Sequence, residues 1–281
     1  MPELPEVEVI RRDLERDVLG RRIKEAEVRS TKNAMRAIRK HDRRKDFSDA
    51  MEGAKIAKIG RRGKYLLLYL DNDNVLVIHL GMSGQLIYTK TSAPFENHTH
   101  VAIQFTVGGQ LRFIDPRTFG QMFTVHRTEL KELKEFEDLG IDALEEPLTW
   151  QYFSQTLDER KTKLKRLLMD QGFISGLGNI YSDEILFAAG IRYDRKSDDL
   201  SSQEVRRLYR AIQEILQDAI KFGGTSADDD QYRNLAGELG EYQDHLKVYQ
   251  QEGKPCRRCR TPIDRTRWSN RSTYYCPQCQ V

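Results

Sequence analysis

The hydrophobic and polar residues of the chain follow two successive patterns along its first 125 positions. Residues 4–19 place apolar side chains at near-helical spacing, with Pro5 suited to a first turn and Gly20 to a stop. Residues 22–125 then contain short strand-like runs separated by turn sequences such as DNDN and GG. The runs are IKEAEV, AKIAKI, KYLLLYL, NVLVIHL, GQLIYT, HVAIQFTV, GQLRFI and QMFTV. The pattern predicts an amphipathic helix followed by a mainly antiparallel sandwich or barrel.

The pattern becomes helical near residue 127. The segments WQYFSQTL, KTKLKRLLMD, GNIYSDEILFAAG and QEVRRLYRAIQEILQDAIKF carry apolar residues at helical spacing. We therefore predict an α+β protein with three parts. These are an N-terminal antiparallel β-sandwich with flanking helices at 1–127, a helical domain at 128–246, and a cysteine-containing end at 247–281.

Charge is distributed unevenly, although the net charge of the 281-residue chain is only +3. The last thirty residues are strongly basic, and residues 222–245 are acidic. A second basic cluster consists of Arg36, Arg39, Lys40, Arg43, Arg44 and Lys45. Such asymmetry favours a nucleic-acid-binding face. For the 36–45 cluster alone, a merely solvated charged surface is an open alternative.

The chain has no feature that predicts a membrane protein or a secreted one. No apolar run approaches the roughly 20 residues that cross a bilayer, and the N-terminus lacks the apolar stretch of a signal peptide. We therefore expect a cytoplasmic protein. Because cytoplasmic cysteines stay reduced, a metal explains four of them better than two disulfides do.

All four cysteines lie in two CxxC pairs near the end of the chain, separated by sixteen residues. The pairs are Cys256 with Cys259 and Cys276 with Cys279. This spacing is typical of a zinc ribbon, and four thiolates leave no open position on a tetrahedral ion. We therefore predict one structural Zn²⁺. A redox CxxC is the alternative, but it requires a single pair near a βαβ unit. The arginines between the pairs, including Arg271, are suited to a phosphate or a groove.

Seven motifs carry a resemblance that runs in one order over nearly the whole chain. They are MPELPEVE at 1–8, RRGKYLL at 61–67, HLGMSG at 79–84, DPRTFG at 115–120, GLGNIYSDEILFAAGI at 176–191, FGGTS at 222–226, and the CxxC pairs. Together they resemble the formamidopyrimidine-DNA glycosylase family. The resemblance implies a helix–two-turn–helix in the helical domain. It also implies a monomeric DNA glycosylase/AP lyase that acts on damaged double-stranded DNA in the bacterial cytoplasm, associated with the nucleoid when acting.

Two details of the motifs bear on the substrate. The related endonuclease VIII usually opens with PEGPE, whereas this chain has Leu4 and also keeps an Arg-x-Phe segment at 117–119. The resemblance therefore favours excision of oxidised purines, meaning 8-oxoguanine and formamidopyrimidines, followed by β,δ-elimination. Excision of oxidised pyrimidines is one alternative. A damaged-DNA-binding zinc protein without catalytic activity is the other.

Pro2 is the predicted nucleophile. Removal of Met1 would leave a secondary amine, and because an α-amino group has a pKa of about 8, a fraction is unprotonated near neutrality. By resemblance, this amine attacks C1′ of the damaged nucleoside, expels the base and holds the sugar as a Schiff base. Glu3 corresponds to the acid that protonates the opening sugar, with Glu6 in support. Without the resemblance, Pro2 would only start a helix and Glu6 would only stabilise its first turn.

Four further residues match catalytic and void-filling positions of the family. By resemblance, Lys64 contacts the phosphate beside the lesion and assists catalysis; otherwise it would be an ordinary edge-strand lysine. An extruded base leaves a hole in the stack that the protein must fill. Met82, Arg117 and Phe119 match the residues that fill it, with Phe119 as the wedge and Arg117 as the partner of the orphaned base. A lone Met or Phe on such loops would more often belong to the core.

The remaining candidates match backbone-binding positions. GLGN supplies small residues and N–H groups that can face an anion at the start of a helix. By resemblance, Asn179 binds phosphate together with Lys64 and Arg271, and Arg271 is associated with the later elimination. Lys161 and His98 match further DNA-contacting positions. The acidic residues 228–230, after FGGTS, depart from the glycine-rich loop of the family and leave the preferred lesion open.

Overall fold

The computed structural model describes residues 1–281 except 32, 146–147 and 228–231. Two compact units are formed, the first by Met1–Glu137 with Phe222–Glu241 and the second by Asp138–Lys221 with Tyr242–Val281. The three-part division at residues 127 and 246 stays a prediction.

The first unit contains two four-stranded antiparallel sheets. Their strand orders are β1-β6-β7-β5 and β2-β3-β4-β8. The strands are β1 (Ile23–Val28), β2 (Ile56–Arg62), β3 (Tyr65–Leu70), β4 (Asn74–His79), β5 (Gln85–Thr89), β6 (Thr99–Phe105), β7 (Gln110–Ile114) and β8 (Gln121–His126). Each coincides with one of the runs identified in the sequence. The predicted α+β class, with antiparallel β-structure in its N-terminal part, is confirmed.

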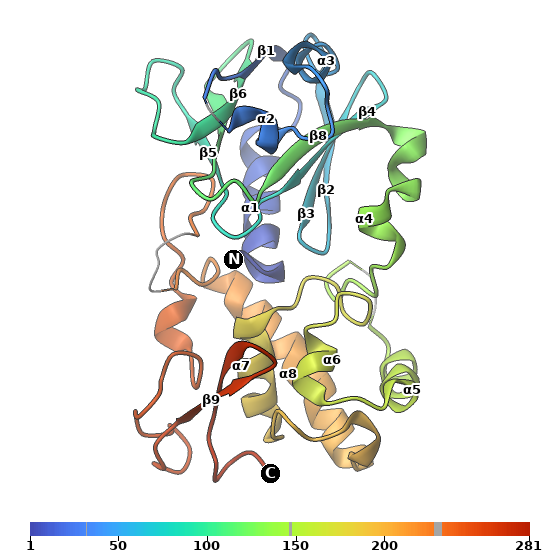
Figure 1. Ribbon diagram of the computed structural model, residues 1–281, viewed down its shortest axis with the longest axis vertical. Helices are drawn as coiled ribbons and strands as arrows, with labels where there is room; N and C mark the ends of the chain where they lie inside the picture. The colour runs from blue at the N-terminus through green and yellow to red at the C-terminus, as the bar shows by residue number, and fades with distance from the viewer. Residues whose placement is uncertain (32, 146–147, 228–231) are drawn as a thin grey trace. The chain divides into compact units, whose positions relative to one another are not determined.

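Helix α1 (Leu4–Asp17) contributes to the core that the two sheets share. Its buried residues Val7, Ile10 and Leu14 recur at helical spacing on one face of the helix. They belong to the same apolar cluster as Phe113 of β7 and Ile78 of β4. Figure 1 shows α1 running alongside the strands of this unit. Burial of one helix face therefore fixes the start of the chain against the sheets.

Two short helices lie between β1 and β2, where the sequence pattern predicted only strands and turns. They are α2 (Ala34–Ala37) and α3 (Arg44–Asp49). Ala34, Ala37 and Phe47 are buried in the shared core, whereas the neighbouring basic residues are mostly exposed. The prediction was wrong here because these helices are short and their few apolar positions lie among many charges. The unit also includes η1 (Arg127–Glu132) and α4 (Lys134–Glu137).

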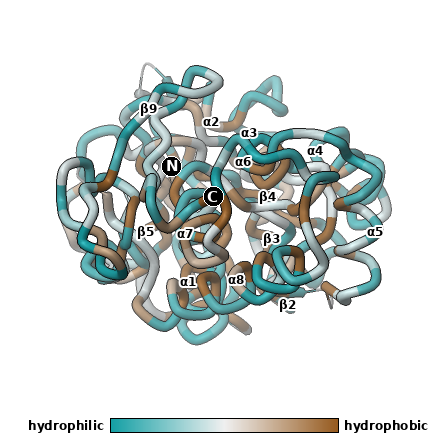
Figure 2. Tube along the Cα trace, turned by 90° about the horizontal axis from the view of Figure 1, so that it is seen from below, coloured by the Kyte–Doolittle hydropathy of each residue, from teal (hydrophilic) through white to brown (hydrophobic). Residues whose placement is uncertain are grey.

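The second unit is mainly helical. Its elements are α5 (Trp150–Arg160), α6 (Leu164–Leu168), α7 (Asn179–Ala189), η2 (Ser197–Asp199), α8 (Ser202–Lys221), η3 (Tyr242–His245) and the hairpin strands β9 (Asp264–Trp268) and β10 (Arg271–Tyr275). Helix α8 is amphipathic, and its buried face includes Leu208, Ile212 and Leu216. Figure 2 shows both hydrophobic and hydrophilic residues around its label. Among the described residues, no helix has both the length and the apolar composition that a membrane span requires.

Candidate functional site

The start of the chain is held by the carboxylate of Glu6. Glu6 is buried, and its Oε2 accepts a hydrogen bond from the N–H of Glu3 at 2.8 Å. Its Oε1 accepts another from the N–H of Thr225, also at 2.8 Å. Pro2 and Glu3 are buried as well. The first turn of α1 is therefore tied to the FGGTS segment, which is more than 200 positions away in the sequence.

The FGGTS segment needs glycine where it meets Glu6. Gly224 has a φ of +84°, and a Cβ there would lie 3.0 Å from both Glu6 Cγ and Tyr232 Cε1. The hydroxyl of Tyr232 donates to the Gly223 carbonyl at 3.0 Å, and Ser226 Oγ donates to the Tyr232 carbonyl at 2.8 Å. These bonds hold the chain on both sides of residues 228–231. The predicted acidic run Asp228–Asp230 lies outside the described residues.

Lys64 lies in the tight turn between β2 and β3 and is largely buried. The preceding strand contributes Arg61, whose side chain is fully buried. Arg61 Nε donates to Glu8 Oε2 at 3.0 Å, and its Nη1 donates to the Gly63 carbonyl at 3.0 Å. Burial opposes ionisation of Glu8, but hydrogen bonds from three arginines hold its pKa below the ordinary value. Arg61 thus connects α1 to the turn that carries Lys64.

Two loops of the first unit present exposed apolar side chains. Met82 is 40% exposed and Phe119 is 53% exposed, so neither side chain is part of the core. The loops meet closely, since a Cβ on Gly81 would lie 2.5 Å from the Gly120 nitrogen. The Arg117 guanidinium carbon lies 5.3 Å from the centre of the Phe119 ring. Three residues that the sequence predicted as void-filling therefore gather on two adjoining loops.

The histidines of this unit differ in environment. His98 is exposed, with a positive φ of 64°. His79 Nδ1 accepts a hydrogen bond from the Gly81 N–H at 3.2 Å. Burial, together with the nearby charges of Lys64 and Arg39, lowers the pKa of His79 to about 4. His79 is therefore neutral near pH 7 and available as an acceptor for the loop that carries Met82.

In the second unit, Asn179 is the first residue of α7, as the GLGN motif predicts. Its Nδ2 donates to the carbonyl of Ser272 at 3.1 Å. Ser272 directly follows the exposed Arg271 at the start of β10. The bond thus joins the N-terminus of α7, where N–H groups and the helix dipole favour an anion, to the strand that bears Arg271. Lys161 is exposed at the C-terminal end of α5.

A buried ion pair, which the sequence analysis missed, locks the hairpin to the helices. Lys165 Nζ donates to Asp183 Oδ1 at 2.7 Å and to Thr273 Oγ1 at 2.8 Å. Asp183 Oδ2 accepts from the Tyr274 N–H at 3.0 Å. Burial raises the pKa of Asp183 to about 7, against the opposing effect of the Lys165 ammonium. The pair fixes β10, and with it Arg271, relative to α6 and α7.

Glu184 makes a second anchor of the same kind and was also missed. Its carboxylate is fully buried and accepts hydrogen bonds from three successive backbone N–H groups, those of residues 247–249. Burial raises the pKa of Glu184 although these donors oppose the shift. The adjacent acids Asp183 and Glu184 directly precede the apolar run ILFAA in α7, and that contrast was the available sequence signal.

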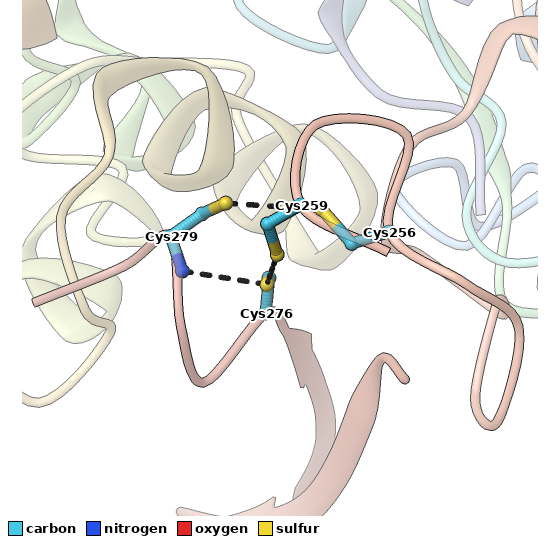
Figure 3. Close-up of side chains that lie close together, drawn as sticks. All are labelled: Cys256, Cys259, Cys276 and Cys279. Carbon is cyan, nitrogen blue, oxygen red and sulfur yellow. Dashed lines mark hydrogen bonds between the residues drawn. The ribbon is translucent and has the colours of Figure 1, made fainter. Parts of the chain in front are cut away.

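The four cysteine sulfurs converge in the second unit (Figure 3). All four Sγ atoms lie within 4.8 Å of one another; the Cys256–Cys279 distance is 3.9 Å and the Cys259–Cys276 distance is 3.4 Å. A tetrahedral zinc with bonds of about 2.3 Å places its sulfurs about 3.8 Å apart. The donor set therefore fits one zinc ion and leaves no open coordination position.

The cysteine cluster packs on the far end of α7. Cys256 and Cys276 belong to one apolar cluster with Phe187. Arg258, between the first two cysteines, donates to the carbonyls of Phe187 and Ala188 at 2.8 and 3.1 Å. A cationic side chain on the last carbonyls of a helix is a favourable C-terminal cap. One helix therefore has the zinc cluster at its C-terminus and Asn179 at its N-terminus.

These features define a zinc-finger protein that combines a unit of antiparallel sheets with a helical unit. Family models match three parts of the chain: the formamidopyrimidine-DNA glycosylase N-terminal domain at residues 1–122, the formamidopyrimidine-DNA glycosylase H2TH domain at 139–231, and the zinc finger found in FPG and IleRS at 253–281. The chain belongs to the formamidopyrimidine-DNA glycosylase family.

Relatives of known name match the chain over its full length. The formamidopyrimidine-DNA glycosylase of Pelotomaculum thermopropionicum is 42% identical and that of Heliobacterium modesticaldum 43%, each match covering 100% of this chain and at least 99% of the relative. The crystal structure of MutM (Fpg) from Thermus thermophilus has a TM-score of 0.86 at 38% identity, covering 99% of this chain and 98% of that one. The complex of Lactococcus lactis Fpg with abasic-site DNA has a TM-score of 0.89 at 33% identity, covering 99% of both chains.

The family resemblance and the zinc prediction are thus confirmed, and the four cysteines hold one structural zinc. The roles assigned to the individual catalytic and DNA-binding residues stay predictions.

Proposed function

We propose that this chain is a bifunctional DNA glycosylase/AP lyase of base excision repair that removes oxidised purines from double-stranded DNA. The observation that carries the proposal is the full-length family match to chains named formamidopyrimidine-DNA glycosylase. Solved relatives from Lactococcus lactis are complexes with abasic-site DNA and with Fapy-dG DNA, which supports this substrate class. We place the reaction in the bacterial cytoplasm, in association with the nucleoid.

Pro2 performs the nucleophilic step in this proposal. After removal of Met1, its secondary amine attacks C1′, the damaged base leaves, and a Schiff base to the sugar remains. Glu3 protonates the opening sugar and moves protons during elimination. Glu6 positions both, because its carboxylate holds the Glu3 N–H at 2.8 Å. Lys64 contacts the phosphate next to the lesion.

The protein binds the DNA in two ways: through contacts with its phosphate backbone, and through side chains inserted where the extruded nucleotide leaves the base stack. We assign phosphate binding to Lys64 in the first unit and to Asn179 and Arg271 in the second, where the Asn179–Ser272 bond supports the placement of the latter two. His98 and Lys161 make further backbone contacts. The exposed side chains of Met82, Phe119 and Arg117 enter the space left by the extruded nucleotide, where Arg117 binds the orphaned base.

The zinc ion has a structural role in this scheme. Four thiolates complete its coordination, so it offers no position to substrate or water. It holds together the hairpin β9–β10, which is too small to form a core of its own. The hairpin in turn carries Arg271, which takes part in the phosphate grip and in the elimination.

Trapping with borohydride tests the nucleophile. We expect wild-type protein, incubated with an abasic-site oligonucleotide and borohydride, to form a covalent adduct whose DNA-linked peptide begins at Pro2. Pro2→Gly replaces the secondary amine and the fixed ring, and should lower the adduct yield at least tenfold. Intact mass spectrometry of the same preparation establishes that Met1 has been removed.

Two results would contradict the mechanism. One is an adduct that maps to a lysine side chain such as Lys64. The other is a fully processed chain that forms no adduct at all, which would favour the non-catalytic DNA-binding alternative.

Excision of oxidised pyrimidines is the second candidate activity. One solved complex of Lactococcus lactis Fpg contains DNA with an oxidised pyrimidine, so the family fold accommodates such a lesion. Competition between duplexes with 8-oxoguanine, Fapy-dG and an oxidised pyrimidine separates the two. Faster excision from the duplex with the oxidised pyrimidine would show that oxidised pyrimidines, and not oxidised purines, are the preferred substrate.

A further inference from the structure

Asp115 begins the DPRTFG motif. Both oxygens of its buried carboxylate accept hydrogen bonds, from the loop that follows it and from the loop that contains Ser83. The side chain is 0% exposed. Its Oδ1 accepts from Ser83 Oγ at 2.6 Å and from the Arg117 N–H at 3.2 Å. Its Oδ2 accepts from the Gly120 N–H at 2.7 Å. A buried carboxylate is tolerated when donors satisfy its oxygens in this way, and charge-assisted bonds are the stronger kind.

The main chain of Asp115 reaches a third loop. Its N–H donates to the His98 carbonyl at 3.1 Å, and its carbonyl lies 2.9 Å from His100 Nε2. One buried residue therefore contacts the loops that carry Met82, Phe119 and His98.

The arrangement exceeds what a local turn requires. An aspartate often accepts a hydrogen bond from the N–H two residues later, and the Arg117 contact alone would fit that role. The Ser83 hydroxyl, however, comes from another loop, 32 positions earlier. Thr118 has a positive φ of 58°, a conformation that persists only when its surroundings hold it. The hydrogen-bonded N–H groups of Arg117 and Gly120 lie on either side of Thr118 and Phe119.

We propose that Asp115 is a positioning residue that clamps the Met82 and Phe119 loops into one rigid wedge, so that both side chains enter the DNA stack together. The inference rests on the proposed function. In this structure the two loops are already hydrogen-bonded to each other, so we expect them to need little ordering when DNA binds. Preorganisation of this kind lowers the entropic cost of inserting side chains into a duplex. The Ser83 hydroxyl donates to Asp115 and accepts from the Arg117 N–H at 3.2 Å, so it joins the two loops into one body.

Ser83→Ala tests the clamp because it removes only the hydroxyl that joins the loops. Stack insertion is followed by the fluorescence of 2-aminopurine placed opposite a tetrahydrofuran abasic analogue in duplex DNA. Schiff-base formation is followed by borohydride trapping on a single-stranded abasic oligonucleotide, which has no stack to fill. We expect Ser83→Ala to reduce the fluorescence amplitude and to slow excision from duplex DNA about tenfold, while trapping on the single strand stays unchanged.

Ser48→Ala serves as the matched control. Its hydroxyl donates to the Ala26 carbonyl elsewhere in the same unit, so it loses a similar hydrogen bond without touching the wedge. Asp115→Asn is the second variant; it keeps the size of the side chain and removes its charge, and should act in the same direction as Ser83→Ala.

Two results would overturn the proposal. One is a folded Ser83→Ala protein whose fluorescence amplitude and duplex excision rate equal those of the wild type. The other is a Ser48→Ala protein in which both quantities fall as much as in Ser83→Ala. Failure of the proposed function is distinguishable, because then the wild-type protein itself would not be trapped on single-stranded abasic DNA.

Discussion

The imidazole of His79 stands where the loop bearing Met82 begins, and it is held in its neutral form. Its pKa of about 4 lies below the value of about 6.5 expected in an unfolded chain. Between those two pH values the unfolded state binds more protons than the folded state. The stability contributed by neutral His79 is therefore fully present above pH 6.5 and is lost as the pH falls towards 4.

His79→Gln should flatten this part of the pH profile. A glutamine carbonyl can still accept from the Gly81 N–H but does not titrate. Between pH 6.5 and 4 the wild-type free energy of unfolding should fall more steeply than that of the variant, by up to about 1.4 kcal/mol per pH unit. Urea unfolding at several pH values measures both slopes. Parallel profiles would show that His79 is not the neutral residue described.

Gly81 gives a second prediction at the level of one residue, with Gly53 as its control. Both have positive φ, 64° and 80°, so alanine at either position has an unfavourable backbone. A Cβ at Gly53 meets nothing within 4 Å, whereas at Gly81 it would meet the Gly120 backbone at 2.5 Å. Gly53→Ala should cost about 1 kcal/mol, and Gly81→Ala about 1–3 kcal/mol more. Equal shifts in the urea midpoint would contradict the close approach of the two loops.

At the scale of elements, helix α7 organises the second unit. Asn179 begins it, Asp183 and Glu184 anchor two other segments from its middle, and Arg258 caps its end. Asp183 and Glu184 are buried acids whose oxygens accept hydrogen bonds from donors elsewhere in the chain. The hairpin therefore depends on α7 for its position as much as on its metal.

Lys165→Met should be strongly destabilising, because it leaves the Asp183 carboxylate buried without its cation. Loss of one partner of such a pair costs about 3–5 kcal/mol. Arg192→Met removes one partner of an exposed pair with Asp194 and should cost about 0–1 kcal/mol. Thermal unfolding compares the two variants. Equal shifts of the unfolding midpoint would show that the buried Lys165–Asp183 pair stabilises the protein no more than the exposed Arg192–Asp194 pair does.

The strands could be predicted from the sequence, whereas the anchors could not. A short strand-like run bounded by turn residues is a local signal, and each strand from Ile23–Val28 to Gln121–His126 coincides with such a run. Glu6, Asp115 and Asp183 act through partners far away in the sequence, such as Thr225 for Glu6. The local context of Glu6 and Asp115 shows only a charged residue, and that of Asp183 shows a pair of acids beside an apolar run without indicating their partners. The exposed wedge residues Met82 and Phe119 were found through family motifs, since hydrophobicity alone would place them in a core.

At the scale of the whole molecule, the metal should be measurable as one ion per chain. Cys276→Ser removes one of the four sulfurs that lie within 4.8 Å of one another. We expect the wild-type protein to contain one zinc and the variant to lose it, with affinity for abasic-analogue duplex falling at least tenfold because the hairpin loses its support. Elemental analysis and a binding titration measure these quantities. A variant that contains no zinc but binds the duplex as tightly as the wild-type protein would contradict the proposed structural role of the metal in DNA binding.

The first unit is completed by a segment that comes late in the chain. Leu235 belongs to its apolar core and accepts a backbone bond from Tyr88, and Thr225 binds Glu6. During synthesis, therefore, the first unit is complete only after residues 222–241 have emerged from the ribosome. By then all four helices from α5 to α8 have already been translated. The first unit is therefore not completed before synthesis of the second begins. Because each unit is built from two separate segments of the chain, a single cleavage of the polypeptide would not release either unit intact.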